Sequence, residues 1–494
     1  MGTKIVDMGG WTKDAAESLG GSEAGLKLIL GQLAGYPLLL FYRKFLSDKD
    51  PKLQHVYFTL SGLFLGHWVI GPGVVHSIYA IIFTYLLLTI AGGTLLSVVV
   101  SFSFHLSYLL VGYWYNNTGD EYDISWTMPQ CVLCLRLIGL TIDVYDGAQL
   151  KLNPDSLSKD QVKNCLTTNP DILEMLSHSF FIGGYFVGPQ FSLRKFQEFA
   201  SPAYHVALPS SPSRFGFKRL MIGVAYLAGH LIGNMFINED WPNSENYTNS
   251  SLPVKLFCLL LWVKIILAKY ISIWLMAEGV CVVSGLSYNG SYEDGSPCWT
   301  GCANVKLRRL ESATRFGHYI EAFNINTNGW VATYVYKRLK FMNNRNISQI
   351  TTLVFLALWH GWHPGYYLTF FNEFISMGFE AEWAKMWAKS KKVELWKLHP
   401  AYQTVTSIIG WVYVHFFLPH CFIPFPLKTA SRIFAAYRSV YFVHFLFYLG
   451  WPVWGRPVKS YLLPPKAKSV EATKSESTPK SVETAKSEDL TKSK

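Results

Sequence analysis

The sequence has too few charged residues for an ordinary soluble protein. Charged residues make up 16% of the 494 residues, whereas a soluble domain has about a quarter. Half of the residues are apolar and 16% are aromatic. The first twenty residues are polar and of mixed charge, and they lack the basic start and apolar core of a cleavable signal peptide. We therefore predict a membrane protein that is inserted through its first spanning helix.

Cysteine is too scarce and too unevenly spaced for a zinc site or a disulfide scaffold. Among eight cysteines, Cys131 and Cys134 form one close pair and Cys298 and Cys302 another. Neither has a second pair at zinc spacing. The first pair lies in an apolar stretch, where free cysteine behaves as a small hydrophobic residue. For the second pair, which lies in a loop, a disulfide is the less favoured alternative to free thiols.

Basic residues outnumber acidic ones, and the formal net charge is +11. A basic chain can bind nucleic acid, but that requires a basic face interleaved with base-stacking aromatic residues. Here lysine and arginine occur in short clusters between apolar runs. This pattern is typical of the cytosolic loops of a membrane protein.

Apolar runs long enough to approach the roughly 20 residues of a membrane helix recur along the chain. The segments are 26–46, 56–73, 74–91, 94–115, 132–144, 172–191, 220–237, 252–286, 350–371, 405–424 and 433–454. Residues 252–286 suit a tilted helix or a helical pair. We expect an all-α, polytopic transmembrane protein with about 9–11 membrane segments, some of them re-entrant.

The loops predict an orientation and a domain organisation. Basic loops after the first segment and at 194–219 should be cytosolic, while the sequons at Asn116, Asn246 and Asn249 lie in loops without lysine or arginine and should be lumenal. We expect a polar segment at 1–25, a membrane-embedded domain at 26–458 and a disordered cytosolic tail at 459–494. The tail repeats a lysine- and serine-rich unit and has almost no apolar bulk.

The segment at 350–371 does not fit this alternation. If it crossed fully, the lysine-rich stretch 381–397 would be lumenal, against the charge rule. We therefore expect the segment to enter the membrane and return. Because irregular backbone at membrane depth is tolerated where it lines a protein cavity, a cavity is predicted around residue 360.

His360 lies in this segment, and an intramembrane histidine is either satisfied by a structural partner or placed for function. The irregular backbone expected at Gly361, Pro364 and Gly365 favours function. His363 raises the alternative of a zinc site, since residues three apart share a helix face. No third ligand is near in the sequence, so no metal is expected.

Three asparagines at alternate positions, Asn324, Asn326 and Asn328, lie between aromatic residues upstream of His360. They can be loop and capping residues. Alternatively, one amide orients a substrate hydroxyl or stabilises an oxyanion. The spacing alone leaves both interpretations open.

The two blocks resemble the membrane-bound O-acyltransferase superfamily, in particular its lysophospholipid acyltransferase branch. That branch carries a Trp-His-Gly-x-x-Pro-Gly-Tyr block, which residues 359–366 match, and an asparagine about three dozen residues earlier, which Asn324 matches. Trp274 with Glu278 and the run 188–192 also resemble it, so the similarity extends from about 172 to 444. The resemblance implies acyl-CoA and a lysophospholipid as substrates, polyunsaturated acyl chains, the endoplasmic reticulum membrane and, less specifically, a homodimer.

On this basis His360 is expected to act as the catalytic base and Asn324 as the positioning or oxyanion group. One base with oxyanion donors suffices for transfer from a thioester, so no cofactor is expected. No Gly-x-Ser-x-Gly motif supports an acyl-serine route. The expected substrate-binding residues are Trp359, Tyr366, Trp330 and Glu278, and the candidates for binding CoA phosphates are Arg308, Arg309, Lys337, Arg338 and Lys340.

Two alternatives to this function remain. The first is an acyltransferase that acts on another lysolipid headgroup, a sterol or a protein. The second is a non-catalytic lipid transporter, which would use intramembrane polar residues to line a path. Matching broken segments in two halves of the chain would favour a transporter, and the sequence has no such repeat.

Overall fold

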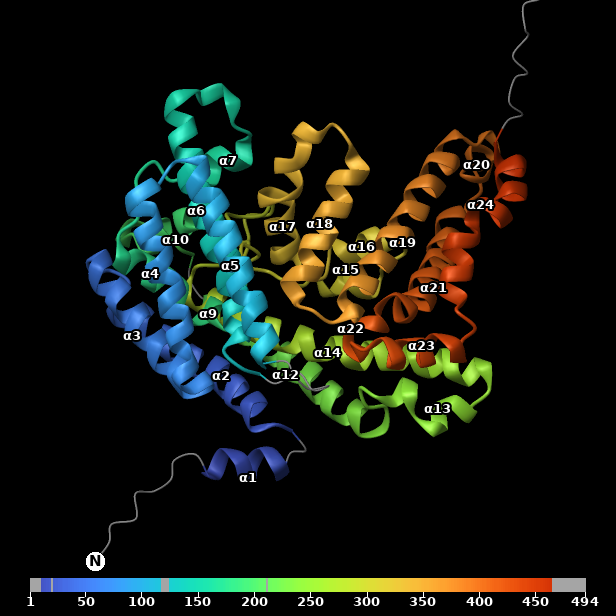
Figure 1. Cartoon of the computed structure of the whole chain (residues 1–494), viewed down its shortest axis with the longest axis horizontal. Helices are drawn as coiled ribbons and strands as arrows, with labels where there is room; N and C mark the ends of the chain where they lie inside the picture. Colours follow the sequence, from blue (N-terminus) through green and yellow to red (C-terminus); the bar gives the residue numbers. More distant parts are fainter. Residues whose placement is uncertain (1–9, 19–20, 117–123, 210–211, 464–494) are drawn as a thin grey trace, which may run out of the picture.

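The computed structural model describes residues 10–18, 21–116, 124–209 and 212–463, which form a helical protein (Figure 1). In these ranges β-structure is limited to two isolated bridges, Ser291 with Pro297 and Val305 with Phe323. The all-α class predicted from the sequence is confirmed. The helices of the first half are α1 (Gly10–Ser18), α2 (Glu23–Phe45), α3 (Pro51–Ile70), η1 (Gly71–Gly73), α4 (Val74–Ala91), α5 (Leu95–Asn116), α6 (Thr127–Leu152), η2 (Pro154–Ser156), α7 (Lys159–Asn164), α8 (Ile172–Phe180), α9 (Ile182–Tyr185), α10 (Leu193–Phe199) and α11 (Pro202–Val206).

The second half contains the longest helix and the helices nearest to His360. The tail predicted at 459–494 begins later than expected, because residues 459–462 belong to α24, and residues 464–494 lie outside the described chain. The helices are α12 (Pro212–Phe236), η3 (Trp241–Asn243), α13 (Glu245–Asn249), α14 (Leu252–Ser284), α15 (Leu307–Glu311), α16 (Phe316–Ile320), α17 (Ile325–Tyr334), η4 (Tyr336–Met342), α18 (Arg345–His360), α19 (Pro364–Lys389), α20 (Lys391–Trp396), α21 (Tyr402–Phe422), α22 (Pro424–Leu427), α23 (Ala430–Ser439) and α24 (Val443–Leu462).

Six helical stretches of the described chain are long and apolar enough to cross a membrane, or up to seven if the bent pair α23–α24 is one span. This number is below the 9–11 expected segments. One reason is that 56–73 and 74–91 fall within a single apolar stretch, Pro51–Ala91. Another is that the expected segment 172–191 is broken into α8 and α9, while α6 carries Arg136 and two aspartates.

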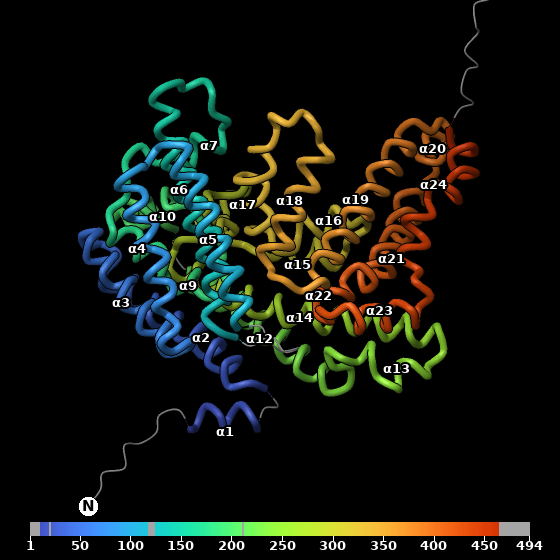
Figure 2. Tube along the Cα trace, viewed as in Figure 1, coloured from blue at the N-terminus to red at the C-terminus, as the bar shows by residue number. Residues whose placement is uncertain are grey.

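The expected segment 252–286 is one continuous helix, α14, of 33 residues. It runs beside α12, as the Cα trace in Figure 2 shows. The two helices approach closely because Gly216 on α12 has no side chain. A Cβ atom there would lie 2.8 Å from the carbonyl oxygen of Gly279. Small residues at such contacts are typical of helix pairs in membranes.

Buried side chains form three large clusters. The N-terminal core includes Tyr42, Phe58 and Phe196 and holds α2, α3, α8 and α10 together. The central core joins α5, α6, α17 and α18, and includes Tyr113, Trp330, Phe355 and Trp359. The C-terminal core includes Leu275, Phe316, Phe417 and Tyr437, and joins α14, α16, α21 and α23. Cys298 and Cys302 are free thiols, so the alternative of a disulfide is not found.

Helices α18 and α19 form a hairpin whose tip lies beside α22 (Figure 1). Gly361 ends α18 with a φ of 120°, a conformation that glycine adopts readily. Pro364 begins α19, where its fixed φ suits the first turn and its missing N–H is not needed. The start of α18 and the end of α19 lie on the same side of the molecule in Figure 1. The chain therefore turns back near residue 360 as predicted, but the returning helix is longer than expected and extends to Lys389.

Candidate active site

Two tryptophans on either side of His360 attach the hairpin tip to neighbouring helices. The indole nitrogen of Trp359 donates a hydrogen bond to the carbonyl oxygen of Cys131 in α6, at 2.9 Å. The indole of Trp362 donates to the carbonyl oxygen of Leu110 in α5, also at 2.9 Å. These bonds fix the direction in which α18 presents His360.

A third attachment comes from α22 and from the residue that follows it. The backbone N–H of Gly365 donates to the carbonyl oxygen of Lys428 at 3.0 Å. A Cβ atom on residue 365 would lie 2.0 Å from the carbonyl oxygen of Pro424, so only glycine permits this approach. The glycine in the block therefore has a packing role that its place in the sequence does not reveal.

The ring of His360 is surrounded by four aromatic rings. The distances between ring centroids are 4.7 Å to Trp359, 5.5 Å to Tyr366, 5.7 Å to Phe370 and 5.1 Å to Phe425. Neither ring nitrogen has a hydrogen bond to a described residue, yet the side chain keeps accessible surface. The nitrogens can therefore bond a ligand.

His363 occupies a different place, at the N-terminal end of α19. Its ring lies edge-on to Tyr366, with the centroids 5.8 Å apart. Within the described ranges, no group of three or more histidine, cysteine, aspartate or glutamate side chains is placed to hold a metal ion.

The asparagine block precedes and begins α17. Asn324 has a left-handed backbone with a φ of 52°, which asparagine tolerates better than most residues. Its side-chain oxygen accepts a hydrogen bond from the amide of Asn304 at 3.3 Å. Its amide nitrogen donates to no described residue and remains accessible.

The other two asparagines have structural partners. The amide of Asn326 donates to the carbonyl oxygen of Ala303 at 2.8 Å. The amide of Asn328 donates to the carbonyl oxygen of Phe323 at 3.0 Å. The loop-and-cap interpretation therefore applies to Asn326 and Asn328, whereas Asn324 is left with a donor for a ligand.

A row of aromatic rings connects the hairpin tip to the asparagine block through α14. Phe425, which contacts His360, lies 6.2 Å from Tyr270, and Tyr270 lies 6.2 Å from Trp274. Trp274 contacts Phe323 edge-on at 4.9 Å. Since Phe323 directly precedes Asn324, His360 and Asn324 lie at the two ends of one aromatic wall.

The four expected substrate-binding residues divide into two groups. Trp359 and Tyr366 contact the ring of His360 directly. Trp330 packs within the central core, where its ring lies 5.1 Å from Tyr334 and 6.0 Å from Phe355. Glu278 is buried in α14, where its carboxylate lies 3.0 Å from the guanidinium of Arg219.

Two of the five expected phosphate-binding residues, Arg308 and Arg309, line an open pocket of about 520 Å³. Lys306 and Arg219 contribute further positive charge. The pocket adjoins the segment that donates to Asn324, because Ala303 forms part of its wall. Its lining residues are Arg219, Thr300, Ala303, Val305, Lys306, Leu307, Arg308, Arg309 and Ser312.

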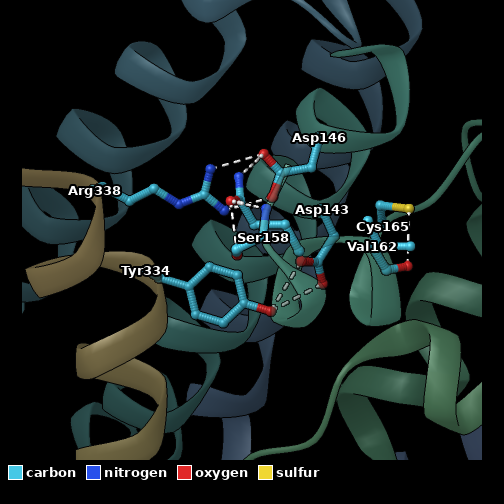
Figure 3. A network of polar contacts seen from close by, with 8 residues as sticks. Asp143, Asp146, Ser158, Val162, Cys165, Tyr334 and Arg338 are labelled. Carbon is cyan, nitrogen blue, oxygen red and sulfur yellow. Dashed lines mark hydrogen bonds and ion pairs between the residues drawn. The ribbon is translucent and has the colours of Figure 1, made fainter. Parts of the chain in front are cut away.

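The other basic candidates lie elsewhere, beside α6 and α7. Arg338 forms two hydrogen bonds with the buried carboxylate of Asp146, at 2.7 and 2.5 Å (Figure 3). Lys337 pairs with Asp160, and this hydrogen bond lowers the pKa of the Asp160 carboxyl below its ordinary value. Lys340 is exposed and makes no ion pair within the described chain. These side chains are not brought to the pocket.

Arg338 belongs to a series of contacts that joins α17 and η4 to α6. One turn before it, the hydroxyl of Tyr334 donates to both oxygens of Asp143, at 2.9 and 3.1 Å (Figure 3). One turn earlier again, Trp330 approaches Gly139, where a Cβ atom would lie 2.8 Å from the indole nitrogen. We call these three contacts the α6–α17 ladder. It fixes the helix that begins after Asn324.

Two structurally important residues escaped the sequence analysis. Arg136 is buried in α6, and its guanidinium donates to the carbonyl oxygens of Gly184 and Pro189 at 2.8 and 3.1 Å. An arginine inside the apolar run 132–144 is the available signal, because a buried charge needs partners. Asn304, which positions Asn324, has no comparable signal, because it stands alone in a loop.

The chain matches the family described as MBOAT, membrane-bound O-acyltransferase, over residues 110–422. It is 39% identical over 440 residues to a mouse protein named lysophospholipid acyltransferase 5, covering 88% of this chain and 89% of the relative. A Drosophila melanogaster protein of the same name is 39% identical over 376 residues, covering 76% of this chain and 74% of the relative. A Caenorhabditis elegans protein of the same name is 32% identical over 473 residues, covering 94% of this chain and 98% of the relative.

Proposed function

Because this chain belongs to the membrane-bound O-acyltransferase family and is a multi-pass membrane acyltransferase, we propose that it transfers a fatty acyl group from acyl-CoA to the free hydroxyl of a lysophospholipid. The preferred acceptor in this proposal is lysophosphatidylcholine, followed by the ethanolamine and serine lysolipids, and the acyl chain is polyunsaturated. The names of the relatives support a lysophospholipid acceptor. We place the enzyme in the endoplasmic reticulum membrane, with its tail in the cytosol.

The observation that carries this proposal is that the side chains of His360 and Asn324 have accessible polar atoms without a protein partner. Both lie on one aromatic wall, and both have polar atoms that are accessible but unbonded. An alcohol is a weak nucleophile near neutral pH, so a base that accepts its proton accelerates attack on a thioester. A neutral imidazole suits this role, and the amide of Asn324 suits the oxyanion or the acceptor hydroxyl.

In the proposed reaction, His360 takes the hydroxyl proton while the oxygen attacks the thioester carbonyl. The tetrahedral intermediate collapses, the carbon–sulfur bond breaks, and the imidazolium returns the proton to the CoA thiolate. The products are a diacyl phospholipid and CoA. No residue forms a covalent bond with the acyl group. The pocket lined by Arg308 and Arg309 supplies positive charge for the phosphates of CoA, close to the Asn324 side of the wall.

The first test compares His360→Ala with His363→Ala in purified, folded, full-length protein. The assay uses radiolabelled acyl-CoA and a panel of lysophospholipids. His360→Ala should reduce kcat by about 10²- to 10⁴-fold, since that is the usual contribution of a general base. His363→Ala should be much milder, and a chelator should have no effect.

Equal losses in the two variants, or inhibition by the chelator, would replace the base mechanism with a structural or metal role for the pair. Transfer to a sterol or peptide, with none to any lysolipid, would overturn the proposed acceptor.

A further inference from the structure

Three residues spaced by seven lie on one face of α19. In an α-helix seven residues complete nearly two turns, so Tyr366, Glu373 and Glu380 point in almost the same direction. The first of them contacts His360. The last accepts hydrogen bonds from the backbone N–H groups of Phe316 and Gly317, at 2.5 and 3.2 Å. Glu373 therefore faces the interior between the hairpin tip and α16.

The chain neighbours of Glu373 confirm where this face points. Phe370 and Phe374 pack against the central core, whereas Leu368 and Ile375 pack against the C-terminal core. Glu373 thus lies along the seam between two packed clusters. The ring of His360 contacts the first turns of the same helix, at Tyr366 and Phe370.

Glu373 is the one carboxylate of this face without a partner in the described chain. It makes no hydrogen bond or ion pair, although protein atoms surround it. Its side chain nevertheless keeps accessible surface, and its oxygens are not sealed. A carboxylate enclosed without a counter-charge is costly, and in a membrane protein such a group marks a ligand path. A cationic ligand would remove that cost.

We propose that Glu373 binds the cationic nitrogen of the lysophospholipid headgroup and thereby selects choline- and ethanolamine-type acceptors. This inference rests on the proposed function. Of the two substrates, acyl-CoA carries phosphates, which a carboxylate repels. The chain that joins these phosphates to the thioester is uncharged. The headgroup nitrogen is the one cationic group that either substrate brings to the interior. Phe370 lies one turn before Glu373 on α19, and an aromatic ring at that place suits a quaternary ammonium through cation–π attraction.

The length of the acceptor agrees with this placement. Seven residues span about 10 Å along a helix, so Glu373 lies about that far from the level of Tyr366 and the His360 ring. About eight single bonds separate the sn-2 oxygen of a lysophospholipid from its headgroup nitrogen, or about 10 Å when extended. One molecule can therefore present its hydroxyl to His360 and its nitrogen to Glu373.

The test measures headgroup preference in the full-length protein at saturating acyl-CoA. For Glu373→Gln, kcat/KM with lysophosphatidylcholine should fall about 10- to 100-fold, chiefly through KM, because a charge-assisted contact is lost. Activity with lysophosphatidylglycerol and lysophosphatidylinositol should be unchanged. Glu373→Asp should recover part of the loss, and Glu373→Lys should favour the acidic headgroups. Glu382→Gln is the matched control, since Glu382 lies on the same helix and already pairs with Lys459 at 2.6 Å.

Equal losses with all headgroups, or no loss with lysophosphatidylcholine, would overturn the inference. If the wild-type chain transfers to no lysolipid, the proposed function fails instead. Should the variants not fold, wild-type inhibition by lysolipid analogues that lack the sn-2 hydroxyl decides the question. The choline analogue should inhibit at least tenfold more strongly than the glycerol analogue, and equal inhibition would contradict the proposal.

Discussion

Polar side chains of the same type differ sharply in how they are bonded in this interior. His178 is bonded to the carbonyl oxygen of Phe191 at 3.0 Å, and Asn326 is held by backbone carbonyls. His360, Asn324 and Glu373 keep accessible polar atoms without a protein partner. An unmade hydrogen bond in a protein interior costs about 1–3 kcal/mol, so such groups persist where a ligand completes them. Both ring nitrogens of His444 also lack a partner, but they are sealed in the interior. Bonding state together with accessibility therefore separates candidate site residues from structural ones better than residue type.

This distinction predicts different outcomes for two neighbouring asparagines. Asn324→Gly removes the side-chain amide, and the glycine that replaces Asn324 tolerates the left-handed backbone. It should reduce kcat by about 10²- to 10³-fold, the usual loss for an oxyanion donor, with little change in Tm. Asn326→Ala should lower the stability by about 1–3 kcal/mol, because it removes bonds to the loop before α15.

Steady-state kinetics and thermal unfolding in the same detergent check both expectations. A large fall in Tm for Asn324→Gly with unchanged kcat would mean that Asn324 is a capping residue.

At the scale of elements, the α6–α17 ladder changes how the basic cluster should be understood. Sequence proximity groups Arg308, Arg309, Lys337 and Arg338 together, but the fold separates them. Arg308 faces the open pocket and makes no ion pair within the described chain. Arg338 instead neutralises Asp146, which is 1% exposed. Arg309 also lines the pocket but pairs with Glu321 at 3.1 Å. Arg308 therefore suits a mobile anionic ligand, whereas Arg338 suits a permanent structural contact.

Arg308→Gln and Arg338→Gln should therefore affect different properties of the protein, the first its KM for acyl-CoA and the second its stability. Arg308→Gln should raise the KM for acyl-CoA about tenfold or more at unchanged Tm, since a charge-assisted contact to phosphate is lost. Arg338→Gln should lower the stability by about 1–3 kcal/mol and leave that KM unchanged, because Asp146 loses its counter-charge. Asp146→Asn in the Arg338→Gln background should recover part of the stability.

Kinetics with varied acyl-CoA and thermal unfolding distinguish the two variants. If Arg338→Gln raised the KM as Arg308→Gln does, the phosphates would extend to η4.

These elements also show which predictions a sequence can support. The segment 74–91 coincides with α4, because the apolar run is uninterrupted and glycines at its two ends mark where the helix begins and ends. His360 stood out because a polar residue in an apolar run needs an explanation. Arg338 could not be assigned, since its partner Asp146 lies 192 positions away in the chain. Glu373 was missed because one glutamate in a mixed helix becomes unusual only when its partners are known to be absent.

For the whole molecule, the α18–α19 hairpin turns back on itself, as expected for a segment that enters the membrane and returns. Both outer ends of the hairpin lie on one side in Figure 1, as the basic stretch 381–397 requires. The sequons at Asn246 and Asn249 lie in and beside α13, between α12 and α14, and both asparagines are exposed. The sequon at Asn116 extends into residues outside those described.

This orientation predicts glycosylation at Asn246 or Asn249 in microsomes. The double variant Asn246→Gln and Asn249→Gln should migrate faster on a gel than the wild-type protein made in microsomes, because it lacks the glycan at these sites. The chain carries its own control, since Asn346-Ile347-Ser348 is a sequon with an exposed asparagine beside the basic segment η4. Asn346→Gln should leave the mobility unchanged, because sequon asparagines are glycosylated on the lumenal side of the membrane and not in the cytosol. Loss of a glycan in that variant would invert the orientation.

The attachment of Gly365 to Lys428, together with the ring of Phe425 on His360, also determines when the enzyme can become active during its synthesis. A ribosome releases the chain in order, so the histidine enters the membrane well before the segment that closes over it. Until α22 has been made, His360 lacks one wall and the hairpin tip lacks one of its three attachments. A nascent chain that stalls before that point therefore lacks both the Phe425 wall of His360 and the backbone contact between Gly365 and Lys428.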